Sequence, residues 1–170
     1  MINHVSIGAR NPEFVANILA EIWKGYTLPF PPIPGAFIAF ADDNCGTCIE
    51  VVPMTNELVP GVGEPDDTLD ASKLVALPFE VQNQKNPNAS NHSATHVSIV
   101  SPLSEEEVTA IAQREGWRVL TCNRGPAFPV IEVWLENRCL LEVMTSEMMA
   151  HYVEFMQPEN WAKALNVPLR

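Results

Sequence analysis

The stretch His4-Val5-Ser6-Ile7 recurs letter for letter as residues 96–99, ninety-two residues further along the chain. A second pair keeps the same offset, because Glu50-Val51 recurs as Glu142-Val143. In both copies the glutamate therefore follows the histidine by forty-six residues. A repeat at fixed spacing is the signature of a duplicated structural unit. We therefore expect two related modules in one chain.

The residues around the first copy predict a strand, a helix and a hairpin. Residues 2–7 form a short β-type run, and Asn11-Pro12 marks the start of a helix. Two further β-type runs, 36–41 and 47–52, flank a turn rich in Asp, Asn and Gly, which is typical of a hairpin.

The second copy predicts the same order of elements. Residues 95–100 are a β-type run, and Ser104 with Glu107 forms a capping box at the start of a helix. Three more β-type runs follow, at residues 117–121, 129–135 and 139–145. We therefore predict an α+β fold in which two tandem βαβββ modules form a cupped mixed sheet.

The whole chain is expected to form one domain, because 170 residues with 46% hydrophobic residues supply one full core. The segment between the modules is rich in Pro, Gly, Asn and Asp, and only Lys73–Val81 has the pattern of an edge strand. A last helix starts at Ser146. The predicted boundaries are module one 1–53, linker 54–93, module two 94–145 and C-terminal helix 146–165.

Composition and charge exclude several classes of protein. The chain has 10 Lys and Arg against 21 Asp and Glu, a net charge of −11, and its basic residues are scattered singly. Nucleic-acid binding needs clustered Lys and Arg side chains, so we expect no nucleic acid as a partner. No run of eighteen apolar residues occurs, so we expect no membrane span. The chain shows no basic and apolar leader, which makes the cytoplasm the expected compartment.

Strand alternation predicts which side chains share a face. Neighbouring side chains of a strand point to opposite faces, so the apolar residues of the repeated strands should face the helices. His4, Glu50, His96 and Glu142 should then lie on the other face. If the modules are related by a pseudo-twofold axis, two imidazoles and two carboxylates converge on one concave surface. Adjacent carboxylates repel each other, and a divalent cation removes that repulsion.

This set of side chains predicts the kind of metal. Two imidazole nitrogens and two carboxylate oxygens suit one divalent ion of Ni, Zn, Co, Mn or Fe. An octahedral ion with four such ligands keeps two adjacent positions open for water or for substrate oxygens. We therefore predict His4, Glu50, His96 and Glu142 as metal ligands.

Three further residues are candidates for contact with a substrate. Arg124 precedes the final hairpin and is suited to clamp a carboxylate or phosphate, with a solvated loop arginine as the alternative. Glu132 and Trp134 alternate with apolar neighbours and should face the cup, either to line a pocket or to fill it. The C-x-x-C motif at residues 45–48 closes a hairpin instead of opening a helix, which argues against thioredoxin-like redox chemistry.

Together these features resemble the vicinal oxygen chelate superfamily, which has the fold of glyoxalase I. The resemblance rests on two βαβββ modules with His on the first and Glu on the last strand of each. Residues 130–142 are similar to the family's final hairpin, with Glu136-Asn137-Arg138 where many members carry Asp-Pro-Asp-Gly. The resemblance implies that Glu142 or Glu50 moves a proton between adjacent carbons of the substrate.

The resemblance also implies an activity. We expect a metal-dependent lyase or isomerase of the glyoxalase type, whose small-molecule substrate binds the metal through two vicinal oxygens and forms an enediolate or oxyanion. A ring-cleaving dioxygenase is one alternative, although such enzymes normally use two His and one carboxylate. A metal-free protein that binds or sequesters small molecules is another. The sequence is compatible with a homodimer.

Overall fold

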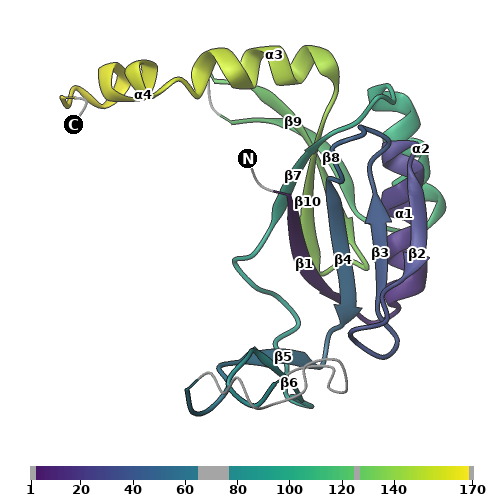
Figure 1. Cartoon of the computed structure of the whole chain (residues 1–170). Coiled ribbons are helices and arrows are strands. Elements are labelled where there is room, and N and C mark those ends of the chain that lie inside the picture. Colours follow the sequence, from purple (N-terminus) through teal and green to yellow (C-terminus); the bar gives the residue numbers. More distant parts are fainter. Residues whose placement is uncertain (1–2, 65–76, 125–126, 169–170) are drawn as a thin grey trace.

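The computed structural model describes residues 3–64, 77–124 and 127–168 of the chain. Two four-stranded mixed sheets lie side by side, and a helix covers one face of each (Figure 1). The predicted α+β fold with two βαβββ modules is therefore confirmed.

The first module has a sheet with strand order β1-β4-β3-β2. β1 is parallel to β4, and the other two strand pairs are antiparallel. The sequence did not predict β2, which forms an edge of this sheet, where a strand tolerates a proline such as Pro29. The elements are β1 (His4–Ala9), α1 (Pro12–Trp23), β2 (Tyr26–Pro29), β3 (Phe37–Phe40) and β4 (Cys48–Pro53).

The second module repeats this topology strand for strand, with the order β7-β10-β9-β8. β7 is parallel to β10, as β1 is to β4. Both first strands, β1 and β7, therefore form an edge of their own sheet. The elements are β7 (Val97–Val100), α2 (Glu105–Arg114), β8 (Val119–Asn123), β9 (Pro129–Leu135) and β10 (Cys139–Met144).

Both helices begin with the caps that the sequence predicts. The Asn11 side chain accepts a hydrogen bond from the backbone N–H of Phe14, and Pro12 occupies the first turn of α1. In α2, Ser104 and Glu107 each accept a hydrogen bond from the other's backbone N–H, which completes the capping box. These caps fix where each helix starts, and the apolar face of each helix then packs on its sheet.

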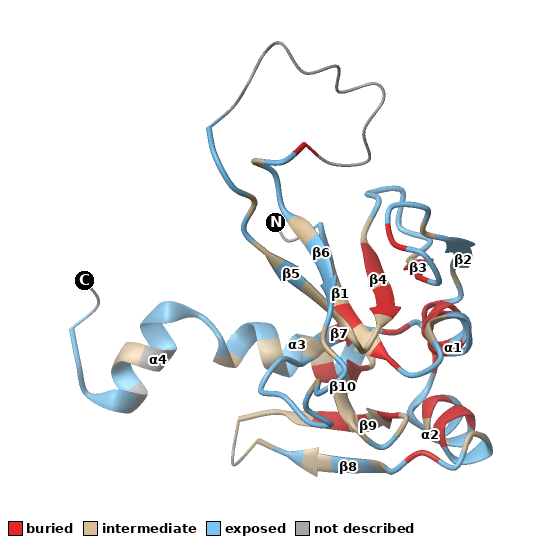
Figure 2. Ribbon diagram, turned by 90° about the horizontal axis from the view of Figure 1, so that it is seen from below, coloured by how far each residue is buried: buried red, intermediate tan, exposed pale blue. Residues whose placement is uncertain are grey.

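The two helices and the helix-facing sides of both sheets share one hydrophobic core. Strand alternation predicts this division, and Figure 2 shows the buried residues gathered on the helices and the central strands. The apolar residues of the repeated strands are part of this core: Ile7, Ile49, Val51, Ile99, Leu141 and Val143. The opposite face of each sheet is left for polar side chains.

The contact between the modules also involves hydrogen bonds. The Glu136 carboxylate, from the β9–β10 turn, accepts hydrogen bonds from the backbone N–H groups of Arg10 (2.7 Å) and Asn11 (2.8 Å) at the start of α1. The buried Ser101 hydroxyl donates to the carbonyl oxygen of Ile22 at the other end of that helix. Module two thus contacts both ends of the first module's helix.

A two-stranded antiparallel hairpin, β5 (Asn56–Val59) and β6 (Gln82–Lys85), projects from the segment between the modules (Figure 1). The sequence predicts an edge strand over residues 73–81, and residues 73–76 of it lie outside the described residues. The described remainder, residues 77–81, is turn and loop, so the pairing in this segment is made by residues that were expected to be linker.

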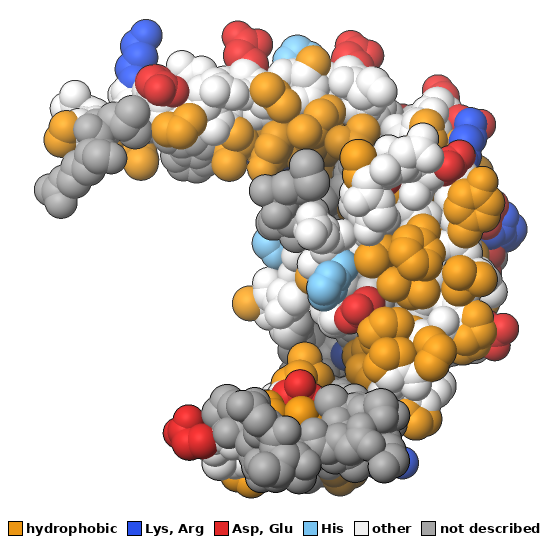
Figure 3. All heavy atoms as spheres, in the orientation of Figure 1, with side chains coloured by type: hydrophobic (Ala, Val, Ile, Leu, Met, Phe, Trp, Pro, Cys, Tyr) orange, Lys and Arg blue, Asp and Glu red, His pale blue; other side chains and the backbone are white. Residues whose placement is uncertain are grey.

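The C-terminal segment forms two helices, α3 (Ser146–Phe155) and α4 (Pro158–Leu165). Pro158 opens α4 because proline fits the first turn of a helix and not its interior. The two helices extend away from the sheets, and Figure 3 shows a hollow between this arm and the β5–β6 hairpin, with histidine and acidic side chains on its inner wall. The described helices are all too short or too polar to span a bilayer.

Candidate functional site

The first half of the candidate site is formed by neighbouring strands β1 and β4. Ser6 pairs with Glu50 in the register of the parallel strands, and its hydroxyl donates a hydrogen bond of 2.5 Å to Oε2 of Glu50. Nε2 of His4 lies 3.9 Å from Oε1 of the same carboxylate. The His4 side chain is 56% exposed and that of Glu50 only 16%. The carboxylate is thus held in place by Ser6, while the imidazole remains accessible.

The donor atoms of the His4–Glu50 pair lie slightly farther apart than two neighbouring ligands of one cation. Metal–nitrogen and metal–oxygen bonds of a divalent first-row ion are about 2.0–2.2 Å long, so two neighbouring ligand atoms lie about 3.0–3.5 Å apart, and the 3.9 Å between these two atoms would have to shorten on binding. The chemistry of the two donors, imidazole and carboxylate, suits the predicted metals. His4 and Glu50 are therefore compatible with one half of the predicted metal site, and their role as ligands stays a prediction.

The second half of the site has a different arrangement. Ser98 pairs with Glu142 in the register of β7 and β10, but the partner of the Glu142 carboxylate is Arg124. The Nε and Nη2 atoms of Arg124 both donate to Oε1 of Glu142, and Nη2 also lies 2.9 Å from Oε1 of Glu132. One guanidinium thus bridges two carboxylates from adjacent strands.

Hydrogen bonding and burial around this guanidinium shift several pKa values. The hydrogen bonds to Glu142 raise the pKa of Arg124, against the opposing effect of burial. Burial by itself would raise the pKa of Glu132, but hydrogen bonds from Arg124 and Cys122 outweigh it and lower that pKa. Burial raises the pKa of the Cys122 thiol, so this cysteine is protonated at neutral pH. The cluster is therefore two carboxylates that are partly neutralised by one fixed cation.

The remaining predicted site residues occupy other positions. His96 precedes β7 by one residue and is exposed, and its Nδ1 lies 3.3 Å from the carbonyl oxygen of Ala94. Trp134 is half-buried on β9, and its ring and that of His92 are nearly perpendicular, with the two ring centres 6.4 Å apart. Neither side chain contacts the His4–Glu50 pair through a hydrogen bond or ion pair that the described residues make.

The chain alone does not bring all four predicted ligands together. Within the described residues, no three His, Cys, Asp or Glu side chains are placed so that they could hold one metal ion. His4 with Glu50 and Glu142 with Arg124 form two separate groups on the sheet faces opposite the helices. In this arrangement the second group does not fit a cation, because the guanidinium already occupies the carboxylate.

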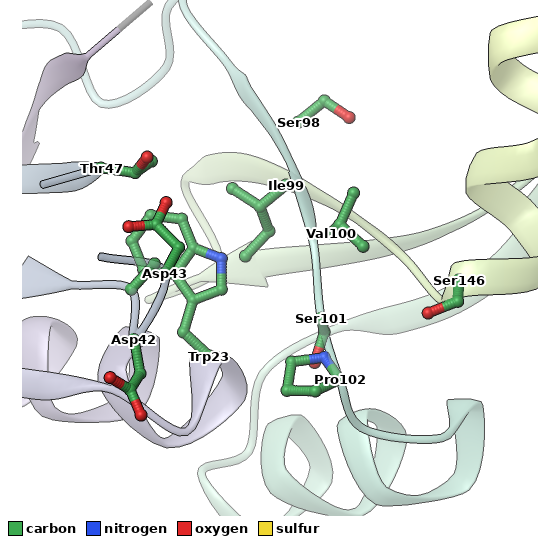
Figure 4. A pocket seen from close by; sticks show the side chains of 11 residues that line it. Trp23, Asp42, Asp43, Thr47, Ser98, Ile99, Val100, Ser101, Pro102 and Ser146 are labelled. Carbon is green, nitrogen blue, oxygen red and sulfur yellow. The ribbon is translucent and has the colours of Figure 1, made fainter. Parts of the chain in front are cut away.

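Two cavities lie near these groups. One, of about 430 Å³, lies beside Glu50 between the first sheet and the β5–β6 hairpin, and sequence reasoning missed it because the hairpin was expected to be linker. The other, of about 480 Å³, lies between the modules and is lined by Asp42, Asp43 and Thr47 on one side and Ser98 and Ser146 on the other (Figure 4). The second cavity contains none of the predicted metal ligands.

Comparison with known proteins supports the fold independently. No family model and no curated protein matches this chain. Among solved structures, the fosfomycin resistance protein FosX from Listeria monocytogenes, complexed with Mn(II) and sulfate, has a TM-score of 0.51 and 9% identity, over 91% of this chain and 97% of that chain.

Two further solved structures have a TM-score of 0.50. A glyoxalase family protein from Bacillus anthracis is 14% identical over 85% of this chain and 93% of that chain. Lactoylglutathione lyase from Agrobacterium tumefaciens is 8% identical over 86% of this chain and 94% of that chain. At these identities the likeness concerns the fold. The chain therefore has the vicinal oxygen chelate fold that the sequence predicts, the fold of the glyoxalases and of FosX.

Proposed function

We propose that this protein is a metal-dependent lyase or isomerase of the glyoxalase type, acting on a small substrate with two vicinal oxygens. The observation that carries the proposal is the His4–Glu50 pair, with donor atoms 3.9 Å apart and the carboxylate fixed by Ser6. The fold adds support, since structures with this fold include a lyase and an Mn(II) complex of FosX.

His4 and Glu50 are the residues that would hold the cation, with His96 and Glu142 completing the set. A divalent ion there would supply a Lewis acid that polarises two substrate oxygens and stabilises an enediolate or oxyanion. Its identity is expected among Ni, Zn, Co, Mn and Fe.

Glu50 is the better placed of the two candidate bases. Its Oε2 accepts the Ser6 hydrogen bond, and Oε1, the oxygen nearest His4, would have to leave the ion before it takes a proton from one substrate carbon and returns it to the next. Glu142 is held by Arg124 and must first be released. The Arg124 guanidinium, once released, is free to bind an anionic group of the substrate.

We further propose that the site is completed in a homodimer. The four ligands do not meet within the described part of one chain, and the first strand of each module, β1 and β7, has an edge that no strand of its own sheet covers. A second copy can approach these edges and the hollow beside them (Figure 3). Light scattering on the purified protein tests this: a monomer at all concentrations and with metal present contradicts it.

Metal content tests the main proposal. Protein purified without chelator should carry about one divalent first-row ion per chain. Metal at one hundred times its dissociation constant should stabilise the chelator-treated protein by about 2.7 kcal/mol, a rise in Tm on the order of 5–10 °C. His4→Gln should lose this gain, and His151→Gln, on an exposed histidine of α3, should keep it. Metal-free protein with no thermal response to any of the five ions overturns the proposal.

One observation favours a second candidate, a metal-free protein that binds small molecules. Within one chain the Arg124 guanidinium already pairs with both Glu142 and Glu132 and partly neutralises them. A binding protein of this kind would show ligand-dependent stabilisation in chelator, whereas the proposed enzyme requires the ion for its turnover of 2-oxoaldehydes or similar substrates.

A further inference from the structure

The cavity of about 430 Å³ beside Glu50 has a volume typical of small-molecule sites. Its floor is the polar face of the first sheet, where Ser6 and Glu50 lie, and its opposite wall is the β5–β6 hairpin. It therefore adjoins the group that we propose as the metal site. The non-reacting part of a molecule bound at Glu50 can therefore occupy this cavity.

Arg138 brings a positive charge to this cavity, whose lining also includes the carboxylate of Glu50. The side chain comes from the turn before β10; its Nη1 donates to the carbonyl oxygen of Gly8 at 2.5 Å, and its Nη2 to that of Ser90 at 3.4 Å. Its Nε is buried without a hydrogen-bond partner. Within the described residues no Asp or Glu forms an ion pair with it, in contrast to Arg114 and Arg124.

A half-buried guanidinium without an anion is an unfavourable arrangement, because desolvation of the charge is not repaid. Carbonyl oxygens offer only partial charges, whereas a carboxylate matches the planar guanidinium in shape and in charge. The position of Arg138 at the edge of the cavity means that an anionic group of a bound molecule can supply the missing partner.

The opposite wall of the cavity combines two exposed apolar side chains with the side-chain amides of Asn56 and Asn83, which are hydrogen-bonded to each other. Leu58 is 60% and Val81 54% accessible to solvent, and Phe30, Ile33 and Met54 continue the apolar lining. Covering apolar surface of this kind is favourable by roughly 25 cal/mol per Å². The two exposed side chains, Leu58 and Val81, together with this lining can therefore cover the apolar part of a ligand.

We propose that this cavity binds a small amphipathic carboxylate, with the carboxylate on Arg138 and the apolar body against the β5–β6 hairpin. This inference names the substrate class of the proposed enzyme. It rests on the proposed function only for the orientation of the substrate, whose vicinal oxygens would point toward Glu50. Arg138 is then a specificity-determining residue and does not take part in the proton transfer.

Isothermal titration of chelator-treated protein with 4-phenylbutyrate and with its uncharged amide tests the inference. The acid should bind about tenfold more tightly than the amide. Arg138→Gln should reduce this ratio to about one, and Arg138→Lys should keep part of it. The matched control is Arg118→Gln, which removes an exposed arginine outside the cavity and should leave the ratio unchanged.

A second variant does not depend on how well Arg138 variants fold. Leu58→Asp adds a negative charge to the exposed wall and should weaken binding of the acid more than that of the amide. Leu28→Asp, at an equally exposed leucine of β2 outside this cavity, should not change the ratio. Failure of the acid to bind, equal affinity for acid and amide, or an acid preference that survives Arg138→Gln overturns the inference.

Titration of the same samples with Mn(II) separates this inference from the proposed function. An acid preference that depends on Arg138 in a protein that binds no metal would leave the inference standing and remove the metalloenzyme. Metal binding without any acid preference would do the reverse.

Discussion

The two modules have the same topology but differ in what binds the carboxylate of their last strand. In module one, Glu50 accepts a hydrogen bond from Ser6 and lies 3.9 Å from the imidazole of His4. In module two, Ser98 has the position of Ser6, yet Glu142 binds Arg124. A duplicated backbone therefore does not guarantee a duplicated electrostatic environment. Module one offers a half-site ready for a cation, and module two offers one whose charge is already partly neutralised.

The largest expected effect concerns what the modules share, which is the core. Ile49→Ala in module one and Leu141→Ala in module two each remove a fully buried side chain next to the corresponding glutamate. Each should cost about 2–5 kcal/mol of unfolding free energy, because a cavity remains. Urea unfolding measures this, with exposed Leu28→Ala as the control. A cost below about 1 kcal/mol in only one module would show that the modules do not share one core.

The next effect concerns the difference between the two carboxylates. Glu50→Gln should weaken Mn(II) binding roughly 100-fold, the upper end of what changes around a metal ligand cost. Glu142→Gln should weaken it less, since Arg124 already competes for that carboxylate. Titration of both variants against Glu57→Gln, a glutamate of the β5–β6 hairpin, measures this. Equal losses would mean that the bound metal makes the half-sites equivalent.

Arg124→Gln tests the same difference between the modules by removing the cation that pairs with Glu142. Without metal, the variant leaves Glu132 and Glu142 as unpaired neighbours on adjacent strands and should lose about 1–3 kcal/mol of stability. With metal, it should bind the ion more tightly than the wild type because the competing cation is gone. Unfolding in chelator and Mn(II) titration give the two readouts. Weaker metal binding would show that Arg124 supports the metal site.

The smallest expected effect is a difference in how the stability contributed by the two helix caps depends on pH. The backbone and side-chain hydrogen bonds with Ser104 lower the pKa of Glu107 below its usual value of 4.5, whereas the cap of α1 is the non-titrating amide of Asn11. A lowered folded-state pKa stabilises the protein above pH 4.5, and this contribution is lost as the pH falls through the folded pKa.

The wild type should therefore lose slightly more stability between pH 6 and pH 3.5 than Glu107→Gln does. Glu106→Gln, at a neighbouring glutamate of α2 outside the capping box, should keep the pH dependence of the wild type. Thermal unfolding across this pH range is the measurement, and identical pH dependence in wild type and Glu107→Gln would contradict the prediction.

Local sequence patterns predicted the fold well because strand alternation and helix caps depend on residues that are close together in the chain. The repeat at residues 4–7 and 96–99 located both modules, Asn11-Pro12 and the capping box located both helix starts, and strand alternation separated core from polar face. The β5–β6 hairpin was missed because its strands are short and polar, such as Gln82–Lys85, and gain their order from pairing across more than twenty residues. The separation of the C-terminal segment into two helices at Pro158 could have been predicted, because the proline ring is not tolerated in a helix interior.

The candidate site was less predictable from the sequence than the fold. The sequence places Arg124 in a loop and suggests a substrate as its partner, but the partner in the structure is Glu142, eighteen residues away. The choice depends on the three-dimensional proximity of the Arg124 side chain to Glu132 and Glu142, which no periodicity records. The assignment of His4, Glu50, His96 and Glu142 as ligands stays a prediction.

The bond between Glu136 and the start of α1 has a consequence for biosynthesis. The ribosome makes α1 more than one hundred residues before it makes the carboxylate that accepts the backbone N–H groups of Arg10 and Asn11. Until then water can satisfy these exposed N–H groups, but the part of the first module's apolar surface that packs in the shared core stays uncovered. Truncated chains that end before Glu136 should then depend on chaperones to remain unaggregated.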